Sequence, residues 1–226
     1  MNNVTTTMLS VDSPMRLVIS SDNEVTAAAQ LCVLKNDLHR RPFGLVEKVY
    51  FDKYLAYGRG KDKKLLETVA LAAQHNNCYK FVLLTEKHDW CVRNIAKKAG
   101  FQDHGVYFKL PLVNFNVPYN EIKSYGVRFS ITKQDKEMAR ARLYVINNGG
   151  LQPFGFMEDV YVDETVRGQG YGTTILETLI DKAQQSACYA LLATSRYERK
   201  KVHELYGRFG FRVAGKEMRK DLDMLI

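Results

Sequence analysis

The chain has 226 residues, of which 46% are hydrophobic and 26% are charged, and it contains 15 Gly and 5 Pro. This composition is typical of a globular protein and excludes disordered, collagen-like and low-complexity chains. The net charge of +8 favours an anionic ligand such as a nucleotide cofactor, or weak contact with nucleic acid, and does not choose between them.

The first residues, 1–14, are rich in Thr and Ser, and we expect them to form a flexible segment. They include no apolar export signal, and the chain nowhere contains about 18 consecutive apolar residues. We therefore expect a cytoplasmic protein that does not interact with membranes. No C-x-x-C pair occurs, so we expect reduced cysteines and no bound metal.

The sequence contains an internal repeat. The run Leu66-Glu67-Thr68 recurs as Leu176-Glu177-Thr178, and Cys78-Tyr79 recurs as Cys188-Tyr189, each 110 positions later. Two copies are too few for a solenoid, so a duplicated domain is the better interpretation.

The repeat defines the expected domains. We place one compact unit at 15–110 and a second at 127–226. The segment 111–126, which contains Pro and Asn, is the expected linker. We expect the two units to associate within the chain as a pseudo-dimer.

The first elements of the second unit are predicted to be strands. Val127, Phe129 and Ile131 alternate with polar residues, which indicates a half-buried strand. The segments 143–146 and 154–163 are expected to form two more strands, and a glycine-rich turn follows.

Helices and strands alternate after that turn. Apolar residues recur at helical spacing over 175–183 and again over 202–209, and the apolar run 188–193 suits a buried strand. The segments 211–214 and 218–222 are expected to form two final strands. The predicted fold class is therefore α/β or α+β, with a mixed central sheet and flanking helices in two tandem units.

The glycine-rich turn reads Arg167-Gly168-Gln169-Gly170-Tyr171-Gly172 and lies where a strand ends and a helix begins. Backbone N–H groups at a helix N-terminus bind anions, and glycine permits positive φ and close approach. Arginine adds a bidentate donor for pyrophosphate oxygens. Neither the dinucleotide fingerprint nor the P-loop pattern fits, so the turn predicts a different phosphate-containing ligand.

Four motifs in this order resemble the acetyl-CoA-binding core of GNAT-superfamily N-acetyltransferases. They are Glu158-Asp159-x-x-Val162, Arg167-x-x-Gly170-x-Gly172, Cys188-Tyr189 and Tyr206-x-x-x-Gly210-Phe211. Within the superfamily, the Glu-Asp pair, the R-G-Q-G-x-G turn, the Cys-Tyr pair and the Glu217-Met218 ending look most like glucosamine-6-phosphate N-acetyltransferases, which does not fix the substrate. The resemblance implies acetyl-CoA as the cosubstrate.

The resemblance also implies which residues bind acetyl-CoA. In the family, a strand hydrogen-bonds the pantetheine arm through its backbone, and the glycine turn holds the pyrophosphate. Carried onto this chain, the strand residues are Val160, Tyr161 and Val162. The turn residues are Arg167, Gly168, Gln169, Gly170, Tyr171, Gly172 and Thr173.

Acetyl transfer to an amine requires a group that accepts a proton, because a free lysine has a pKa of about 10.4. Glu158 is the first candidate. Strand alternation predicts that it shares a face with Phe156 and Val160, where apolar surroundings would raise its pKa toward neutrality. A bulge in the strand would instead present Asp159, so both carboxylates remain candidates for the base.

Tyr206 matches the position where the family's tyrosine hydroxyl protonates the departing CoA thiolate or hydrogen-bonds to it. The resemblance therefore implies a catalytic role for its phenol. Its place on the apolar side of the predicted helix also fits a core aromatic residue, and the two roles are compatible.

The first unit lacks parts of this pattern. Its corresponding turn, Tyr57-Gly58-Arg59-Gly60-Lys61-Asp62, has Tyr in place of the leading Arg and Asp in place of the last Gly, and Ala96 matches Tyr206. A carboxylate repels phosphate, and alanine has no proton to give. We therefore expect a degenerate GNAT-like unit that keeps the fold without the catalysis.

Together these patterns predict an N-acetyltransferase that moves an acetyl group from acetyl-CoA to a primary amine by direct attack in a ternary complex. The acceptor is a small molecule or a protein, and the sequence does not distinguish a lysine, an α-amine, an amino sugar or a polyamine. One alternative is a non-catalytic module that binds acyl-CoA, nucleic acid or another protein. Another is a transferase of a different acyl group. Nucleic acid is the less favoured partner, because no basic helix with interleaved aromatic residues stands out.

Overall fold

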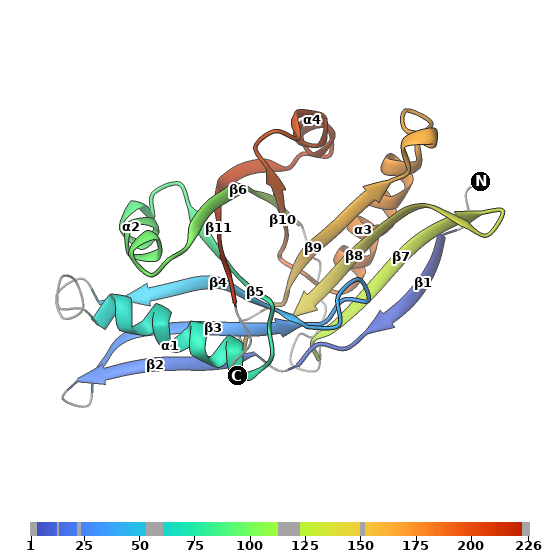
Figure 1. The fold of residues 1–226 in the computed structure, drawn as a ribbon. Helices are drawn as coiled ribbons and strands as arrows, with labels where there is room; N and C mark the ends of the chain where they lie inside the picture. The colour runs from blue at the N-terminus through green and yellow to red at the C-terminus, as the bar shows by residue number, and fades with distance from the viewer. Residues whose placement is uncertain are drawn as a thin grey trace. The chain divides into compact units, whose positions relative to one another are not determined.

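The computed structural model describes residues 4–12, 14–21, 24–52, 61–112, 123–149 and 152–222. Strands and helices alternate along both halves of the chain (Figure 1). In chain order they are β1 (Val4–Leu9), β2 (Met15–Ser21), β3 (Glu24–Leu34), β4 (Phe43–Phe51), α1 (Lys61–His75), β5 (Lys80–Glu86), α2 (Trp90–Lys98), β6 (Gln102–Pro111), β7 (Tyr125–Lys133), β8 (Lys136–Ile146), β9 (Phe154–Val162), a 3-10 helix (Glu164–Val166), α3 (Tyr171–Gln185), β10 (Ala190–Arg196), α4 (Lys200–Arg208) and β11 (Arg212–Asp221). In this part of the chain, no helix is both long and apolar enough to cross a membrane.

The chain divides into two compact units. Unit 1 contains Met1–Val11 and Lys109–Thr194, and unit 2 contains Asp12–Phe108 and Ser195–Ile226. The end of the second sequence repeat, with α4 and β11, therefore belongs to the unit built mainly from the first repeat. The domain boundaries inferred from the sequence repeat, 15–110 and 127–226, stay a prediction. The two units described here are defined by contacts in space and not by sequence similarity.

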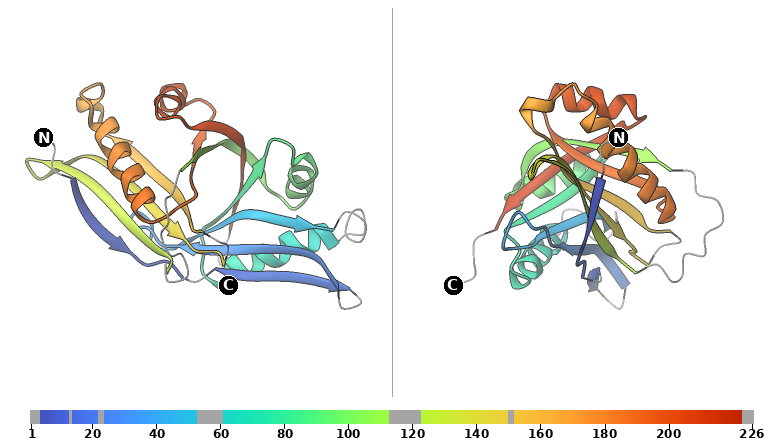
Figure 2. Two further views of the ribbon diagram at one scale, coloured as in Figure 1. Left: turned by 180° about the vertical axis from the view of Figure 1, so that it is seen from behind. Right: turned by 90° about the vertical axis from the view of Figure 1, so that its right-hand side faces the viewer.

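Unit 1 contains a mixed sheet covered on one face by a helix. β7, β8 and β9 are antiparallel neighbours, and β10 lies parallel to β9. α3 connects β9 to β10 and packs against β7, β8 and β9 (Figure 2). The helix comes close to the sheet at Gly155, where an added Cβ would lie 3.7 Å from the Cβ of Ala183. The apolar side predicted for 175–183 is buried here, which confirms that helix.

The first residues of the chain form a strand, which differs from the expectation. The segment 1–14, expected to be flexible, contains β1, which pairs antiparallel with β7 from Val4 opposite Ile131 to Leu9 opposite Gly126 (Figure 1). The β-branched residues at positions 4–7 suit an extended backbone, and the edge of β7 offers unpaired N–H and C=O groups. The Thr-rich composition misled the prediction because threonine is both polar and a strand former.

Unit 2 has a similar sheet, completed by the last strand of the chain. β2, β3 and β4 are antiparallel neighbours, and β5 lies parallel to β4. β11 then pairs antiparallel with β5, from Gly215 opposite Glu86 to Asp221 opposite Lys80. The second sequence repeat therefore supplies a strand to the sheet of the first.

β11 replaces the two final strands predicted at 211–214 and 218–222. The run Gly215-Lys216-Glu217, which lies between the two predicted strands, is part of this one strand. Glycine is required there because an added Cβ at Gly215 would lie 1.8 Å from the carbonyl oxygen of Thr85 on β5. The glycine thus permits close strand approach and does not mark a turn.

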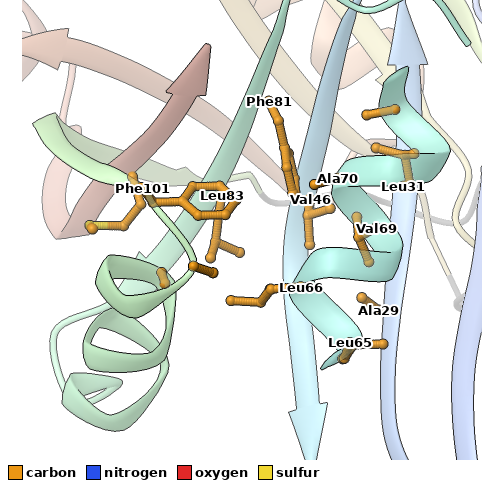
Figure 3. Packing of buried hydrophobic residues seen from close by; sticks show 14 of the residues in the cluster. Ala29, Leu31, Val46, Leu65, Leu66, Val69, Ala70, Phe81, Leu83 and Phe101 are labelled. Carbon is orange, nitrogen blue, oxygen red and sulfur yellow. The ribbon is translucent and has the colours of Figure 1, made fainter. Parts of the chain in front are cut away.

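The core of unit 2 lies between its sheet and the helices α1 and α2. α1 packs on β2 and β3, and its residues Leu65, Leu66, Val69 and Ala73 have no exposed surface. Phe101 lies edge-on against Phe81, with ring centroids 4.8 Å apart (Figure 3). The order of strands and helices in both units confirms the predicted mixed α and β fold.

Candidate functional site

Strand β9 contains a β-bulge at its polar end. Glu158 lies opposite Arg142 of β8, and Tyr161 lies opposite Arg140, so two residues of β9 intervene where β8 has one. Asp159 has φ +51° in this bulge, a left-handed conformation that non-glycine residues rarely adopt. The bulge considered from sequence is therefore confirmed.

The bulge decides which β9 side chains share a face. Gly155 faces α3, so the alternation places Phe156 and Glu158 on the opposite face, as predicted. Beyond the bulge, Tyr161 and not Val160 shares that face, because paired residues project to the same side of a sheet. The prediction that Val160 lies beside Glu158 was wrong, and a buried arginine opposes Glu158 across the strands.

Asp159 is the acceptor of two arginine side chains. The Nε of Arg140 donates to its Oδ2 at 2.5 Å, and Nη1 of Arg142 donates to the same oxygen. Arg142 has no exposed surface, and 22% of the Asp159 side chain is exposed. A buried guanidinium requires such a partner, since an unpaired charge in the interior is costly.

Arg140 links this pair to the start of β8. Its Nη1 donates to Glu137 at 2.8 Å, and its guanidinium lies over the Tyr161 ring, 4.4 Å from the centroid. Burial lowers the Arg140 pKa, but hydrogen bonds to Asp159 and Glu137 outweigh burial and hold the pKa above its usual value. The group therefore remains charged.

Sequence reasoning missed this ionic cluster. A signal was present, because Arg140 and Arg142 alternate with Ala139, Ala141 and Leu143 in an apolar stretch of strand. Two arginines on one face of such a strand require acidic partners.

The parallel ladder between β9 and β10 ends early. It runs from Gly155 opposite Leu191 to Met157 opposite Ala193, whereas β9 continues to Val162. Beyond Met157, in the part of unit 1 that the structure describes, this side of β9 is not paired with β10. The main chain of Val160–Val162 can therefore offer N–H and C=O groups to an extended ligand, although the carbonyl oxygen of Val162 already accepts from Arg167 Nε at 3.2 Å.

The glycine turn follows β9 directly. Asp163 caps the 3-10 helix by accepting from the backbone N–H of Thr165 at 3.0 Å, and its hydrogen bonds to Thr165 and Lys136 hold its pKa well below the usual range. Gly168 and Gly170 have φ of +82° and +86°, and an added Cβ at either would meet nothing within 4 Å. The predicted need for positive φ is thus met, with open space above both glycines.

The turn leads into the N-terminus of α3. The first turn of the helix is closed by the N–H of Thr174, which donates to Gly170 O at 3.0 Å. The N–H groups of Tyr171, Gly172 and Thr173 precede it and point out of the helix end. Arg167 lies beside them with 58% of its side chain exposed, donating to Glu164 at 3.0 Å. Gln169 is also exposed and donates to Thr165 O.

Tyr206 lies in α4 and is 3% exposed. Its ring contacts Phe108 and Phe211, with centroids 5.4 and 5.3 Å apart. Burial raises the pKa of its phenol above the usual value, although the charge of Arg199 acts in the opposite direction. Among the described residues, its hydroxyl has no recorded hydrogen-bond partner, so the core-aromatic role is confirmed and the hydroxyl keeps its proton.

The predicted site residues are divided between the two units. Glu158, Val160–Val162 and the turn up to Thr173 lie together in unit 1, where β9 leads directly into the turn and α3. Tyr206 belongs to unit 2. In the first repeat, Ala96 is buried on α2, and positions 57–60 of the degenerate turn lie outside the described residues.

Comparison with known proteins shows what part of the chain is similar to. Residues 114–211 match the model of the acetyltransferase (GNAT) family. The matched region includes the elements from β7 to α4 with the glycine turn among them, and it ends at Phe211, directly before β11.

One curated relative is similar to part of the chain. A glucosamine 6-phosphate N-acetyltransferase of Trypanosoma brucei brucei is 33% identical over 73 residues, which cover 32% of this chain and 48% of that protein. The chain thus matches about half the length of this curated relative.

Two solved structures share the fold over most of the chain. A tandem GNAT protein from the clavulanic acid biosynthesis pathway is 10% identical, with a TM-score of 0.52 over 98% of this chain and 85% of that one. A GCN5-related N-acetyltransferase from Sphaerobacter thermophilus is 13% identical, with a TM-score of 0.53 over 93% of this chain and 82% of that one. These likenesses concern the fold.

Proposed function

We propose that this protein is an N-acetyltransferase that transfers an acetyl group from acetyl-CoA to a primary amine by direct attack in a ternary complex. The observation that carries the proposal is the arrangement at the end of β9. There the main chain of β9 is no longer paired with β10. The glycine turn that follows β9 leads into the N-terminus of α3. An extended thioester arm and a diphosphate suit these two adjacent features.

The strand would bind the pantetheine arm. An extended ligand next to Val160–Val162 gains the main-chain hydrogen bonds that β10 does not make beyond Ala193. Tyr161 would take part through its backbone, since its ring lies against Arg140.

The turn would bind the pyrophosphate. The N–H groups at the start of α3 carry the positive end of the helix dipole. Open space above Gly168 and Gly170 suits close approach of phosphate oxygens, and Arg167 adds an exposed positive charge. The residues of this turn therefore fit the diphosphate of acetyl-CoA.

The chemistry requires one proton acceptor and one donor. The attacking amine loses a proton, for which Glu158 is the proposed base. Asp159, the other candidate, accepts hydrogen bonds from Arg140 and Arg142. Tyr206, protonated because its phenol is buried, is the proposed donor to the departing thiolate.

The alternatives make different predictions. A non-catalytic module would bind acyl-CoA or a macromolecule without releasing a thiol. A transferase of another acyl group would prefer a longer or charged acyl-CoA. The acceptor class, the cytoplasmic location and the intramolecular pseudo-dimer stay predictions from sequence.

A thiol-release assay tests the proposal directly. The full chain is incubated with acetyl-CoA and a panel of amines that includes amino sugars, polyamines, α-amines and lysine peptides, and free CoA is measured over time. We expect amine-dependent release with at least one acceptor class. Calorimetric binding of acetyl-CoA without release by any amine would favour the binding module instead.

A further inference from the structure

We propose that the ion pair between Arg142 and Asp159 is a positioning device that fixes the β9 bulge for catalysis. This inference rests on the proposed function, because it assigns a role beside the proposed base. Neither residue is a catalytic group in this proposal. They act through the backbone of β9, which carries Glu158 on one side of the bulge and Val160–Val162 on the other.

The backbone at Asp159 needs an external constraint. A left-handed conformation is unfavourable for a non-glycine residue, and asparagine and aspartate tolerate it best. A one-residue slip of the ladder would relieve the bulge and turn Glu158 toward the α3 face. The constraint must therefore hold both the conformation and the register.

Arg142 supplies this constraint because it is buried. With no exposed surface, its guanidinium has an anionic partner in Asp159, which reaches it from the bulge. Register slip would withdraw that carboxylate and leave a buried charge poorly paired, which is among the most destabilising changes in a protein interior. Arg140 holds the same carboxylate from the next position along this face of β8.

The first repeat offers an internal comparison. Its strands β3 and β4 show a register shift between Ala29 and Leu31. When Ala28 opposite Tyr50 is matched with Arg140 opposite Tyr161, this shift lies one residue further along than the shift in β8 and β9. There Gln30 takes the place of Arg142, and Lys48, with 70% of its side chain exposed, takes the place of Asp159.

The two repeats differ in whether an arginine–aspartate pair is present at the register shift. The first repeat has a register shift without an arginine–aspartate pair, and none of residues 47–49 of β4 has the positive φ that Asp159 has. The pair occurs in the repeat that keeps the intact glycine turn. We assign it to holding the bulge in one geometry where a reaction depends on it.

Asp159→Asn is the first substitution, and the hydrogen-exchange measurement below separates a positioning role from a role of Asp159 as the base. Asparagine keeps the volume and tolerates the left-handed backbone, but it removes the charge that pairs with Arg142. We expect kcat to fall about 10- to 100-fold while the KM for acetyl-CoA changes less than about threefold. Arg128→Gln is the matched control, since it breaks the part-buried pair with Glu137 on the neighbouring strand and leaves Asp159 paired. We expect a change in kcat of less than about threefold.

A double variant separates positioning from stability. Arg142→Met with Asp159→Asn removes both charges, and Arg140 keeps its pair with Glu137, so part of the lost stability should recover. If the pair positions the bulge, kcat stays low in the recovered protein. Recovery of kcat together with stability would overturn the proposal, as would an unchanged kcat in Asp159→Asn. If the single variant fails to fold, the double variant decides.

Hydrogen exchange provides a readout that does not require activity. We expect the backbone amides of 159–162 to exchange faster in Asp159→Asn than in the parent and at the parental rate in Arg128→Gln. If the parent releases no thiol with any amine, the proposed function fails while exchange still tests the role of the pair. Unchanged exchange over 159–162 would then contradict the positioning role.

Discussion

Phe108 lies edge-on against Tyr206, with ring centroids 5.4 Å apart and ring planes at 83°. Phe108 comes from the last strand of the first sequence repeat, and Tyr206 comes from the second. Both belong to unit 2. The repeat that lost the catalytic motifs thus packs against the phenol of the repeat that retained them.

Replacing Tyr206 with phenylalanine should separate catalysis from folding. Because the hydroxyl has no recorded partner in the described part of the chain, Tyr206→Phe should change the free energy of unfolding by less than about 0.5 kcal/mol. We expect turnover to fall about 10- to 100-fold with little change in acetyl-CoA affinity. Steady-state kinetics beside calorimetry measure both, and unchanged turnover would reject the role of the phenol.

Phe108→Leu should loosen the packing around Tyr206. Loss of the edge-to-face contact and of ring volume should destabilise the protein by about 1–2 kcal/mol. The control is Phe101→Leu, which removes a similar edge-on contact with Phe81 elsewhere in unit 2. Chemical denaturation should show comparable losses of stability, whereas only Phe108→Leu should lower turnover. Equal effects on turnover would show that Phe108 has no particular relation to Tyr206.

Glycine 170 should be needed for ligand binding more than for folding. Gly170→Ala places a side chain at φ +86°, and Gly149→Ala does the same at φ +77° outside the turn. Each should lose about 1 kcal/mol of stability. We expect only Gly170→Ala to weaken acetyl-CoA binding, by about tenfold, since the added carbon occupies the approach to the helix N-terminus. Calorimetry on both variants provides the comparison, and equal affinities would argue against the turn as the diphosphate site.

Gly215→Ala should disrupt the β5–β11 ladder. The added Cβ would lie 1.8 Å from Thr85 O, a clash with backbone that side-chain movement does not relieve. We expect a loss of about 2–4 kcal/mol in the free energy of unfolding. Gly207→Ala in α4, where an added Cβ meets nothing within 4 Å, should instead stabilise by about 0.5 kcal/mol. Thermal and denaturant unfolding of the two variants would reveal opposite shifts, and a stable Gly215→Ala would refute this pairing.

The cysteines should differ in reactivity. None of the four forms a disulfide, and burial raises the pKa of Cys78 to about 11 and of Cys188 to about 12. Cys91 is only half-buried. Since the thiolate is the reactive form, a disulfide reagent at pH 8 should label Cys91 first, and Cys91→Ala should remove the fast phase. A fast phase that persists in this variant would contradict the burial of the other thiols.

Local sequence patterns predicted much of unit 1. Apolar alternation around Phe129 and helical spacing around Leu179 are set by burial against one neighbouring layer, so both elements were found. The positive φ of Gly168 and Gly170 followed from the glycine spacing. These features depend on residues close together in the chain.

Features that depend on distant partners were missed. β11 is one strand because its partner is β5, which is far away in the sequence. No residue near Gly215 indicates that the carbonyl group of Thr85 lies next to this glycine. The side-chain direction of Val160 depends on a bulge whose register is set by β8. The ion pair of Asp159 joins two strands and is not encoded at one fixed spacing.

The pairing of β5 with β11 also bears on biosynthesis. A ribosome completes β5 long before it reaches Asp221, so the nascent first repeat carries an open sheet edge throughout that interval. Such an edge recruits strands from other polypeptides. Translation speed and chaperone supply should therefore govern how much of this polypeptide matures without aggregating.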